Sequence, residues 1–368
     1  VPISIRTDNS RDLEMMPSDL SDFNLYGGLY RYVNLVYAPA VSIDKIFANA
    51  EVDKAGKSGK MTIKGRFYNP QSVSVGHVEV QVLDPTGKSI FKTELALGFG
   101  AGEDITLANI QVKNPELWST DKPLLYTVEL TVKTDYGKYF QLEKVGFRNF
   151  EFLEKGPFML NGKRLLLKGT HRHEDHAGVA AAMTEDMMRT EMKMMKEMGV
   201  NFIRLGHYQQ SRIILDLCDS LGITVWEEIP WCRGGLGGDV YKEQGRRMLT
   251  NMIEQHYNHP SVIIWGLGNE NDWPNDFPEF DKAQIRAYMS ELNDLSHKLD
   301  PSRKTAIRRC DFCKDIVDVY SPSIWAGWYR GNYTEYKGVS KEEFEKVKRF
   351  LHVEWGGDSH AKRHSENP

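Results

Sequence analysis

The stretch "HPSVIIWGLGNENDWP", from His259 to Pro274, decides the fold. Residues 262–267 form an apolar run, and amide and carboxylate side chains follow it at once, among them Asn269 and Glu270. A strand that is apolar on both faces is typical of a parallel sheet covered by helices. Because amides and carboxylates are costly to desolvate, we expect this strand to end in a site that uses them.

Around this strand, from Phe150 onward, strand-like segments alternate with helical patterns such as "TEDMMRTEMKMMKEMG". No G-x-G-x-x-G motif follows the first strand, which argues against a dinucleotide-binding fold. Polar residues cluster after most strands, as they do at the active-site face of a (β/α)8 barrel. We therefore predict a (β/α)8 TIM barrel over residues 148–368, truncated after about seven strands in what we expect to be a fragment of a longer polypeptide. The seven candidate strands are "RLLLKG", "NFIRLG", "ITVWEEI", "VIIWGLG", "KTAIRR", "DVYSPSI" and "FLHVEWG".

Residues 41–147 have an all-β pattern. Segments such as "HVEVQVLD" and "LLYTVELTVKT" alternate with period two, and turn signals such as Asp84-Pro85-Thr86-Gly87 separate them. Short strands at this spacing predict an immunoglobulin-like β-sandwich that acts as a spacer. Residues 1–40 resemble the end of another β-domain, in which "LYRYVNLVY" is strand-like.

Composition excludes several classes of function. Charged residues make up 27% of the chain and the formal net charge is −4, so no charge excess favours nucleic acid or a membrane surface. No apolar run approaches the ~18 residues that span a bilayer. The four cysteines are too few for a disulfide scaffold, and Cys310 and Cys313, a lone C-x-x-C, are interpreted as ordinary thiols. There is no signal peptide and no initiator Met; a periplasmic or secreted location is the expectation, with a cytoplasmic one as the alternative.

Glu270 and Glu354 are the candidate catalytic pair. Glu270 ends the fourth predicted strand and Glu354 the seventh, and a barrel brings these two strand ends to opposite sides of one mouth. Facing carboxylates roughly 5 Å apart suit glycosidic cleavage with retention, and a separation beyond about 9 Å would contradict it. The alternative is that each Glu forms a structural salt bridge with Arg204 or Arg308.

Several motifs together resemble glycoside hydrolase family 2. They are "DFNLYGGLYR", "NPELWSTDKPLLYTVEL", "LNGKRLLLKGTHRHEDH", "MKEMGVNFIRLGHY", "DLCDSLGITVWEEIP", "NHPSVIIWGLGNEND" and "LHVEWGGDSH". The resemblance covers nearly the whole chain in order and spacing. It implies a sugar-binding jelly roll, of which residues 1–40 would be the C-terminal part, then an immunoglobulin-like sandwich and a (β/α)8 catalytic barrel.

The resemblance also implies roles for individual residues. Glu270 matches the acid/base and Glu354 the nucleophile. The other matched residues are Asn269 at the sugar 2-hydroxyl, His173 and His207 at the sugar subsite, Arg204 beside the nucleophile, Glu228 as a supporting acceptor, and Asp22 reaching the sugar from the first domain. Trp355 is expected to face the pocket. Trp325, with Trp328 and Tyr329, is expected to form an aromatic wall, where core packing is the alternative.

No metal site is predicted and no cofactor is expected to be required. His171, His173 and His176 could be interpreted as a metal cluster, but no H-E-x-x-H motif supports it. Members of the resembled family can hold Mg²⁺ through a Glu and a His after the third strand. Here that segment reads "IPWCRGGLGG" and contains neither residue, so the sequence does not support Mg²⁺.

These patterns predict a retaining exo-β-glycosidase, with β-galactosidase as the main interpretation. The alternatives within the family are β-glucuronidase and β-mannosidase, and the alternative from another class is a non-catalytic carbohydrate-binding scaffold. The predicted partner is a β-linked oligosaccharide or glycoconjugate, with no nucleic acid and no membrane, and a homo-oligomer is compatible with the sequence.

Overall fold

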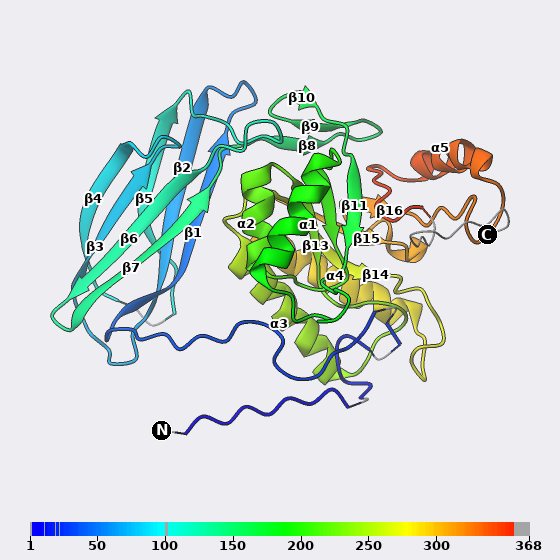
Figure 1. Ribbon diagram of the computed structural model, residues 1–368, viewed down its shortest axis with the longest axis horizontal. Coiled ribbons are helices and arrows are strands. Elements are labelled where there is room, and N and C mark those ends of the chain that lie inside the picture. Colours follow the sequence, from blue (N-terminus) through cyan, green and yellow to red (C-terminus); the bar gives the residue numbers. More distant parts are fainter. Residues whose placement is uncertain (1, 11, 19, 22, 100–101, 357–368) are drawn as a thin grey trace.

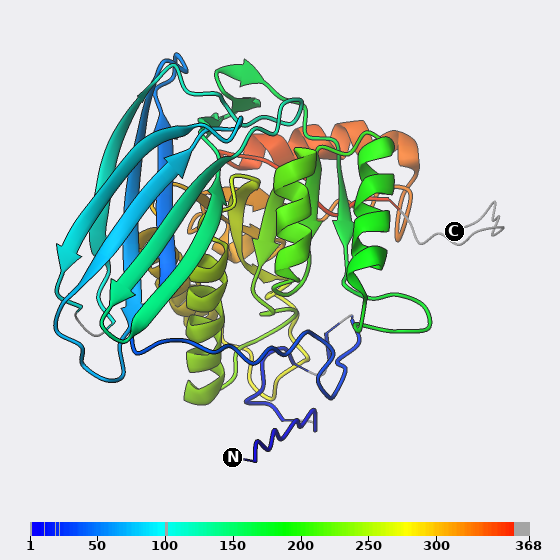
Figure 2. The ribbon, with the colours of Figure 1, turned by 60° about the vertical axis from the view of Figure 1, so that its left-hand side comes forward.

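The computed structural model describes residues 2–10, 12–18, 20–21, 23–99 and 102–356. A β-sandwich lies on one side of the molecule and a parallel sheet with its helices on the other (Figure 1). The N-terminal segment runs along the lower side of the barrel helices in both ribbon views (Figure 2). No helix in the described part of the chain has the length and apolar character that crossing a membrane requires.

The sandwich consists of two antiparallel sheets that face each other. In strands such as β2 and β3 alternate residues are buried, so each sheet turns one apolar face inward. Val80, Leu130 and Ile63 lie in this core with no exposed surface. One sheet has the order β1 (Ser42–Val52), β2 (Ser58–Tyr68), β5 (Ile105–Lys113), and the other the order β4 (Ser89–Leu97), β3 (Gly76–Leu83), β6 (Tyr126–Thr134), β7 (Gly137–Val145).

Six parallel strands form the incomplete barrel, and their order in the sheet is their order in the sequence. They are β11 (Gly169–Arg172), β12 (Phe202–Leu205), β13 (Thr224–Glu228), β14 (Val262–Asn269), β15 (Lys304–Arg308) and β16 (Val319–Ser321). The helices are α1 (Glu185–Glu197), α2 (Arg212–Leu221), α3 (Asp239–His256), α4 (Lys282–Leu299) and α5 (Tyr336–Lys346), with 3-10 turns η1 (Asp311–Cys313) and η2 (Tyr333–Glu335). All eight residues of β14 are buried, because helices and neighbouring strands cover both of its faces. The predicted sandwich and incomplete barrel are confirmed.

Two predicted barrel strands differ from the structure. The first was predicted over residues 164–169, but β11 begins only at Gly169. The leucines before it continue a small sheet of β8 (Phe150–Phe152), β9 (Phe158–Leu160) and β10 (Lys163–Arg164), where the Leu165 N–H donates to the Phe158 carbonyl at 3.0 Å. An apolar run alone does not show which neighbour a strand will pair with.

The seventh predicted strand, residues 350–356, does not form a regular strand. It runs beside β16 with one parallel bridge, between Tyr320 and Phe350, and the Leu351 N–H donates to the Tyr320 carbonyl at 3.2 Å. β16 itself has only three residues, so it offers few backbone groups for a ladder. The segment nevertheless brings Glu354 to the edge of the sheet.

The strand predicted over residues 29–37 is also not formed. No described residue between 2 and 40 belongs to a helix or strand. Leu35, Val36 and Tyr37 are mostly exposed. A strand needs a partner for its backbone N–H and C=O groups, and none of the described residues supplies one here.

The sandwich is fixed to the barrel through the C-terminal half of α3 and the start of β14. Arg66 forms a two-bonded ion pair with Glu254, at 2.9 and 3.0 Å. The Asn258 side chain donates to the Ile46 carbonyl at 2.7 Å and accepts from the Ala48 N–H at 2.8 Å. The Arg148 guanidinium donates to the Val262 carbonyl at 2.8 Å. These contacts hold the sandwich at the end of β14 that is opposite to Glu270.

Two helix-ending glycines allow a paired test of packing. Gly222 ends α2 and Gly199 follows α1, and both have positive φ, of 69° and 91°. A Cβ at Gly222 would lie 2.5 Å from the Thr120 carbonyl oxygen, whereas nothing lies within 4 Å of one at Gly199. We expect both Ala variants to lose stability through φ, by about 1–2 kcal/mol. Gly222→Ala should lose about 1–3 kcal/mol more through the clash. Denaturant unfolding measures the difference, and equal losses would contradict it.

Candidate active site

The fourth parallel strand ends in the two predicted site residues Asn269 and Glu270. The pairing of β14 with β15 shifts register between Gly266 and Asn269, and such irregularities often re-aim side chains next to functional sites. Glu270 then adopts a left-handed backbone with φ 55°, a conformation that costs a non-glycine residue about 1 kcal/mol or more. Its N–H donates to the Arg308 carbonyl at 3.0 Å, which holds this turn in place. Glu270 is 9% exposed.

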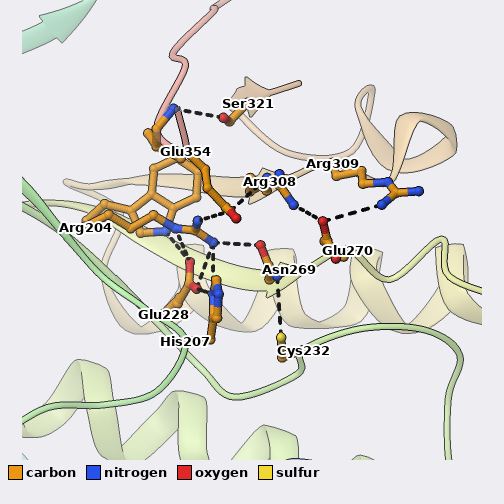
Figure 3. A network of polar contacts seen from close by, with 12 residues as sticks. Arg204, His207, Glu228, Cys232, Asn269, Glu270, Arg308, Arg309, Ser321 and Glu354 are labelled. Carbon is orange, nitrogen blue, oxygen red and sulfur yellow. Dashed lines mark hydrogen bonds and ion pairs between the residues drawn. The ribbon is translucent and has the colours of Figure 1, made fainter. Parts of the chain in front are cut away.

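Arg204, on β12, contacts several of the predicted site residues (Figure 3). Its guanidinium is fully buried and donates to both oxygens of Glu228, at 3.0 and 2.9 Å. It also donates to the Asn269 amide oxygen at 2.8 Å and to Glu354 at 2.9 Å. One arginine therefore sets the positions of an amide and two carboxylates that come from three different segments.

Glu228, at the end of β13, has further partners. The Trp226 indole N–H donates to its Oε2 at 2.7 Å, and His207 Nδ1 lies 2.6 Å from its Oε1. Burial raises the pKa of Glu228, although the charge of Arg204 opposes that shift. Its contacts are with protein groups, which is the arrangement expected of a supporting acceptor.

Glu354 lies on the extended segment beside β16. The Val353 N–H donates to the Ser321 hydroxyl at 3.2 Å. The Glu354 side chain is 35% exposed, and besides Arg204 it pairs with Arg308, whose Nε lies 2.9 Å from its Oε2. Among the described residues, Arg204 and Arg308 are the cations that pair with the predicted nucleophile.

Arg308 contacts both predicted catalytic carboxylates. Its Nη1 is paired with Glu270 and its Nε with Glu354 (Figure 3). Two contacts of hydrogen-bond length across one guanidinium keep the nearest carboxylate oxygens within about 8 Å of each other. The pair thus lies inside the limit of about 9 Å that glycosidic cleavage requires. The salt bridges foreseen as the alternative are also present, so the two interpretations coexist in one site, and the catalytic roles stay predictions.

The arginines decide the charge of Glu354. Burial would raise the pKa of this carboxyl, but the positive charges of Arg308 and Arg204 outweigh burial and hold the pKa below its ordinary value. A carboxylate that must attack has to be ionised at neutral pH, and this environment keeps it so.

The lowered pKa of Glu354 predicts a loss of stability in acid. Because the folded pKa lies below the ordinary 4.5, the charge stabilises the fold fully above about pH 4.5, and this contribution is lost as the pH falls through the folded pKa. We expect Glu354→Gln to flatten that part of the pH dependence. Thermal midpoints recorded from about pH 7 down to about pH 3 test this; an unchanged acid slope in the variant would contradict it.

Three histidines meet beside this network. His171 lies on β11, His173 directly follows it and His207 follows β12, with ring centroids 4.9 to 5.2 Å apart. Of the three histidines weighed from sequence as a possible metal cluster, His176 lies apart: it is exposed and its Nδ1 lies 2.9 Å from the Ala177 carbonyl, while His207 lies with the other two. Proximity in sequence misled here because residues 173–176 leave the strand in a loop.

The N-terminal segment reaches the same region. The Phe23 ring lies 5.8 Å from His173 and 5.9 Å from His207. Arg31 forms an ion pair with the buried Glu174 at 2.8 Å. A cavity of about 620 Å³ lies between this segment and the barrel, with Phe23, Arg31, Tyr208 and Met248 among its lining residues. Asp22, predicted to reach the sugar, lies outside the described residues.

The predicted aromatic wall is partly formed. Trp325 contacts Tyr329 edge-on at 5.6 Å, and Arg309 lies over the Trp325 ring at 5.2 Å. Trp328 contacts the same Tyr329 at 5.3 Å. Trp355 is 63% exposed, so its contact with a sugar stays a prediction.

Sequence reasoning missed several contributors to the site. Arg309 lies 3.4 Å from Glu270, and the Asn269 amide donates to the Cys232 thiol at 3.4 Å. Burial raises the pKa of Cys232 to about 12, so it stays a neutral thiol. The signal that could have found Arg309 is its place directly after a barrel strand, where side chains face the mouth.

Family models match the two main parts of the chain. The model described as "Glycosyl hydrolases family 2" matches residues 41–148, and "Glycosyl hydrolases family 2, TIM barrel domain" matches residues 152–362. The chain belongs to glycosyl hydrolase family 2. The β-sandwich and the barrel region of the chain correspond to these two family 2 domains.

Individual family 2 proteins are similar to this chain. The Parabacteroides merdae β-glucuronidase, known from a crystal structure, has 67% sequence identity to this chain and a TM-score of 0.96. The match covers 98% of this chain and 45% of that one. The Bacteroides fragilis β-glucuronidase is 33% identical over 89% of this chain and 48% of its own length. A β-galactosidase of Thermoanaerobacterium thermosulfurigenes is 31% identical over 82% of this chain and 41% of its own length. The chain spans less than half the length of these relatives.

Proposed function

We propose that the intact protein is a retaining exo-β-glycosidase that removes terminal β-glucuronic acid from oligosaccharides or glycoconjugates. The observation that carries this proposal is the pair of carboxylates, Glu270 and Glu354, held within reach of each other by Arg308. The glucuronide preference is supported by the 67% identity to a solved β-glucuronidase, against 31% to a curated β-galactosidase. It replaces the galactoside as the favoured substrate and agrees with the alternative drawn from sequence.

The proposed first step forms a covalent intermediate. A Glu354 oxygen bonds to the anomeric carbon while the bond from that carbon to the leaving oxygen breaks, and protonated Glu270 gives its proton to that oxygen. Arg204 and Arg308 keep Glu354 ionised for this attack. The Asn269 amide oxygen already accepts from Arg204 and one amide N–H donates to Cys232, which leaves the other N–H to face the sugar 2-hydroxyl.

In the proposed second step, the Glu270 carboxylate removes a proton from water. The water oxygen bonds to the anomeric carbon, the ester bond to Glu354 breaks, and the sugar leaves with its original configuration. Arg308 and Arg309, which pair with Glu270, hold its side chain in position for this step. Neither step calls for a metal ion.

The test is a substrate panel on the intact polypeptide: nitrophenyl β-glucuronide, β-galactoside and β-mannoside. We expect kcat/KM for the glucuronide to exceed the others by at least ~100-fold, because a site built for a charged group rejects substrates that lack it. NMR of the first sugar released should show the β-anomer. A preference for the galactoside would overturn the specificity, and no turnover of any substrate would favour a non-catalytic scaffold.

A further inference from the structure

A compact group of three imidazoles lies at the carboxyl ends of two adjacent parallel strands. One nitrogen from each of His171, His173 and His207 lies within 4.8 Å of the other two. The Gly206 backbone packs against His171, because a Cβ at position 206 would lie 2.2 Å from His171 Nε2. Parallel strands and this close backbone contact hold the three rings together.

The ring nitrogens are left without protein partners. Among the described residues, His171 Nε2 and His173 Nδ1 are buried and accept or donate no hydrogen bond. Buried polar atoms in native proteins nearly always have a partner, so these two call for one from outside the chain. An ion or a ligand at the cluster would supply it.

His207 has the support that metal-binding histidines usually have. Its Nδ1 lies 2.6 Å from a Glu228 oxygen, which leaves the other ring nitrogen free. A carboxylate behind a histidine fixes the ring orientation and makes the free nitrogen a better ligand.

We propose that His171, His173 and His207 bind a borderline divalent transition-metal ion, with Zn²⁺ as the representative. Three imidazoles and one open position form a common zinc geometry, with Zn–N distances of about 2.0–2.1 Å. The nitrogens would have to close by an ångström or so, within the reach of side-chain rotation. The cations nearby, Arg204 and Arg308, are each paired with carboxylates.

The ion is distinct from a catalytic cofactor, because the proposed two-step reaction needs none. Its open position faces the predicted sugar subsite, which His173 and His207 line. A bound ion would therefore occupy space that the substrate needs and would act as an inhibitor.

Calorimetric titration of the metal-stripped intact polypeptide with Zn²⁺ tests the proposal. We expect one equivalent to bind, and His171→Asn and His173→Gln each to weaken binding by at least ~10-fold. His176→Asn is the matched control, since this histidine belongs to the same loop but lies outside the cluster. It should bind Zn²⁺ as the unchanged protein does, and thermal midpoints verify that each variant folds.

Three outcomes would overturn the site: no stoichiometric binding, undiminished binding in both cluster variants, or an equal loss in His176→Asn. Asp216, Asp219 and His259 form the other candidate group among the described residues. A loss of binding in Asp216→Asn but not in the histidine variants would place the ion there and would also refute the proposal. Because binding is measured without substrate, the outcome is independent of the proposed glycosidase activity.

Discussion

Glu354→Gln should lower kcat/KM for an aryl β-glucuronide by roughly 10⁴-fold or more. The neutral amide cannot bond to the anomeric carbon as a carboxylate does, so the covalent intermediate is lost. The amide also no longer neutralises Arg204 and Arg308, which contact this side chain at 2.9 Å each. Steady-state kinetics on the intact polypeptide measure the effect.

The matched control is Glu345→Gln on α5, whose carboxylate is 64% exposed and lies 3.9 Å from Lys155. It should leave kcat/KM within about twofold, since exposed ion pairs contribute little. A stronger check removes the side chain altogether: in Glu354→Gly, added azide should restore turnover and give the α-glycosyl azide. A loss of less than about tenfold in Glu354→Gln would remove Glu354 from the role of nucleophile.

Arg204→Met is the change with the largest expected effect on stability. The guanidinium is fully buried and donates to Glu228, Asn269 and Glu354. Methionine fills a similar volume but leaves the buried Glu228 carboxylate without its main counter-charge. Breaking a buried ion pair from one side costs about 3–5 kcal/mol, which corresponds to a fall in Tm of roughly 10 °C. Thermal denaturation followed by circular dichroism measures it.

Arg189→Met provides the comparison for Arg204. Arg189 is an exposed helix residue paired with Glu185 one turn away, and such pairs contribute about 0.3–0.5 kcal/mol. The Tm of Arg189→Met should stay within about 2 °C of the Tm of the unchanged protein. Similar shifts in the two variants would mean that the buried network contributes no more than an ordinary surface pair.

The regular part of the fold could be predicted because periodicity reports burial. Alternating residues such as those of β3 show one inward face, and the apolar run of β14 shows two. The strand predictions for residues 29–37 and 350–356 were wrong for a different reason. A strand-like pattern states only that a segment suits a sheet, and whether it forms a ladder depends on a partner that sequence does not identify.

The part of the candidate site that lies at strand ends could be predicted, because the sequence indicates where the buried strands end. Asn269, Glu228 and Arg204 end buried strands, so a barrel brings them to one mouth. What sequence could not supply is the choice of partner. The sequence indicated Arg308 as a salt-bridge partner of one carboxylate, whereas the structure shows that it contacts two. The structure likewise shows that His207, and not His176, lies with His171 and His173.

One cation shared by two anions has a thermodynamic consequence. If esterification or mutation removes the charge on Glu354, the attraction of Arg308 is concentrated on Glu270. The two acids then form a coupled unit, and a double-mutant cycle across them should give a non-zero interaction energy. Each half of the double displacement would in this way change the electrostatic environment in which the other half begins.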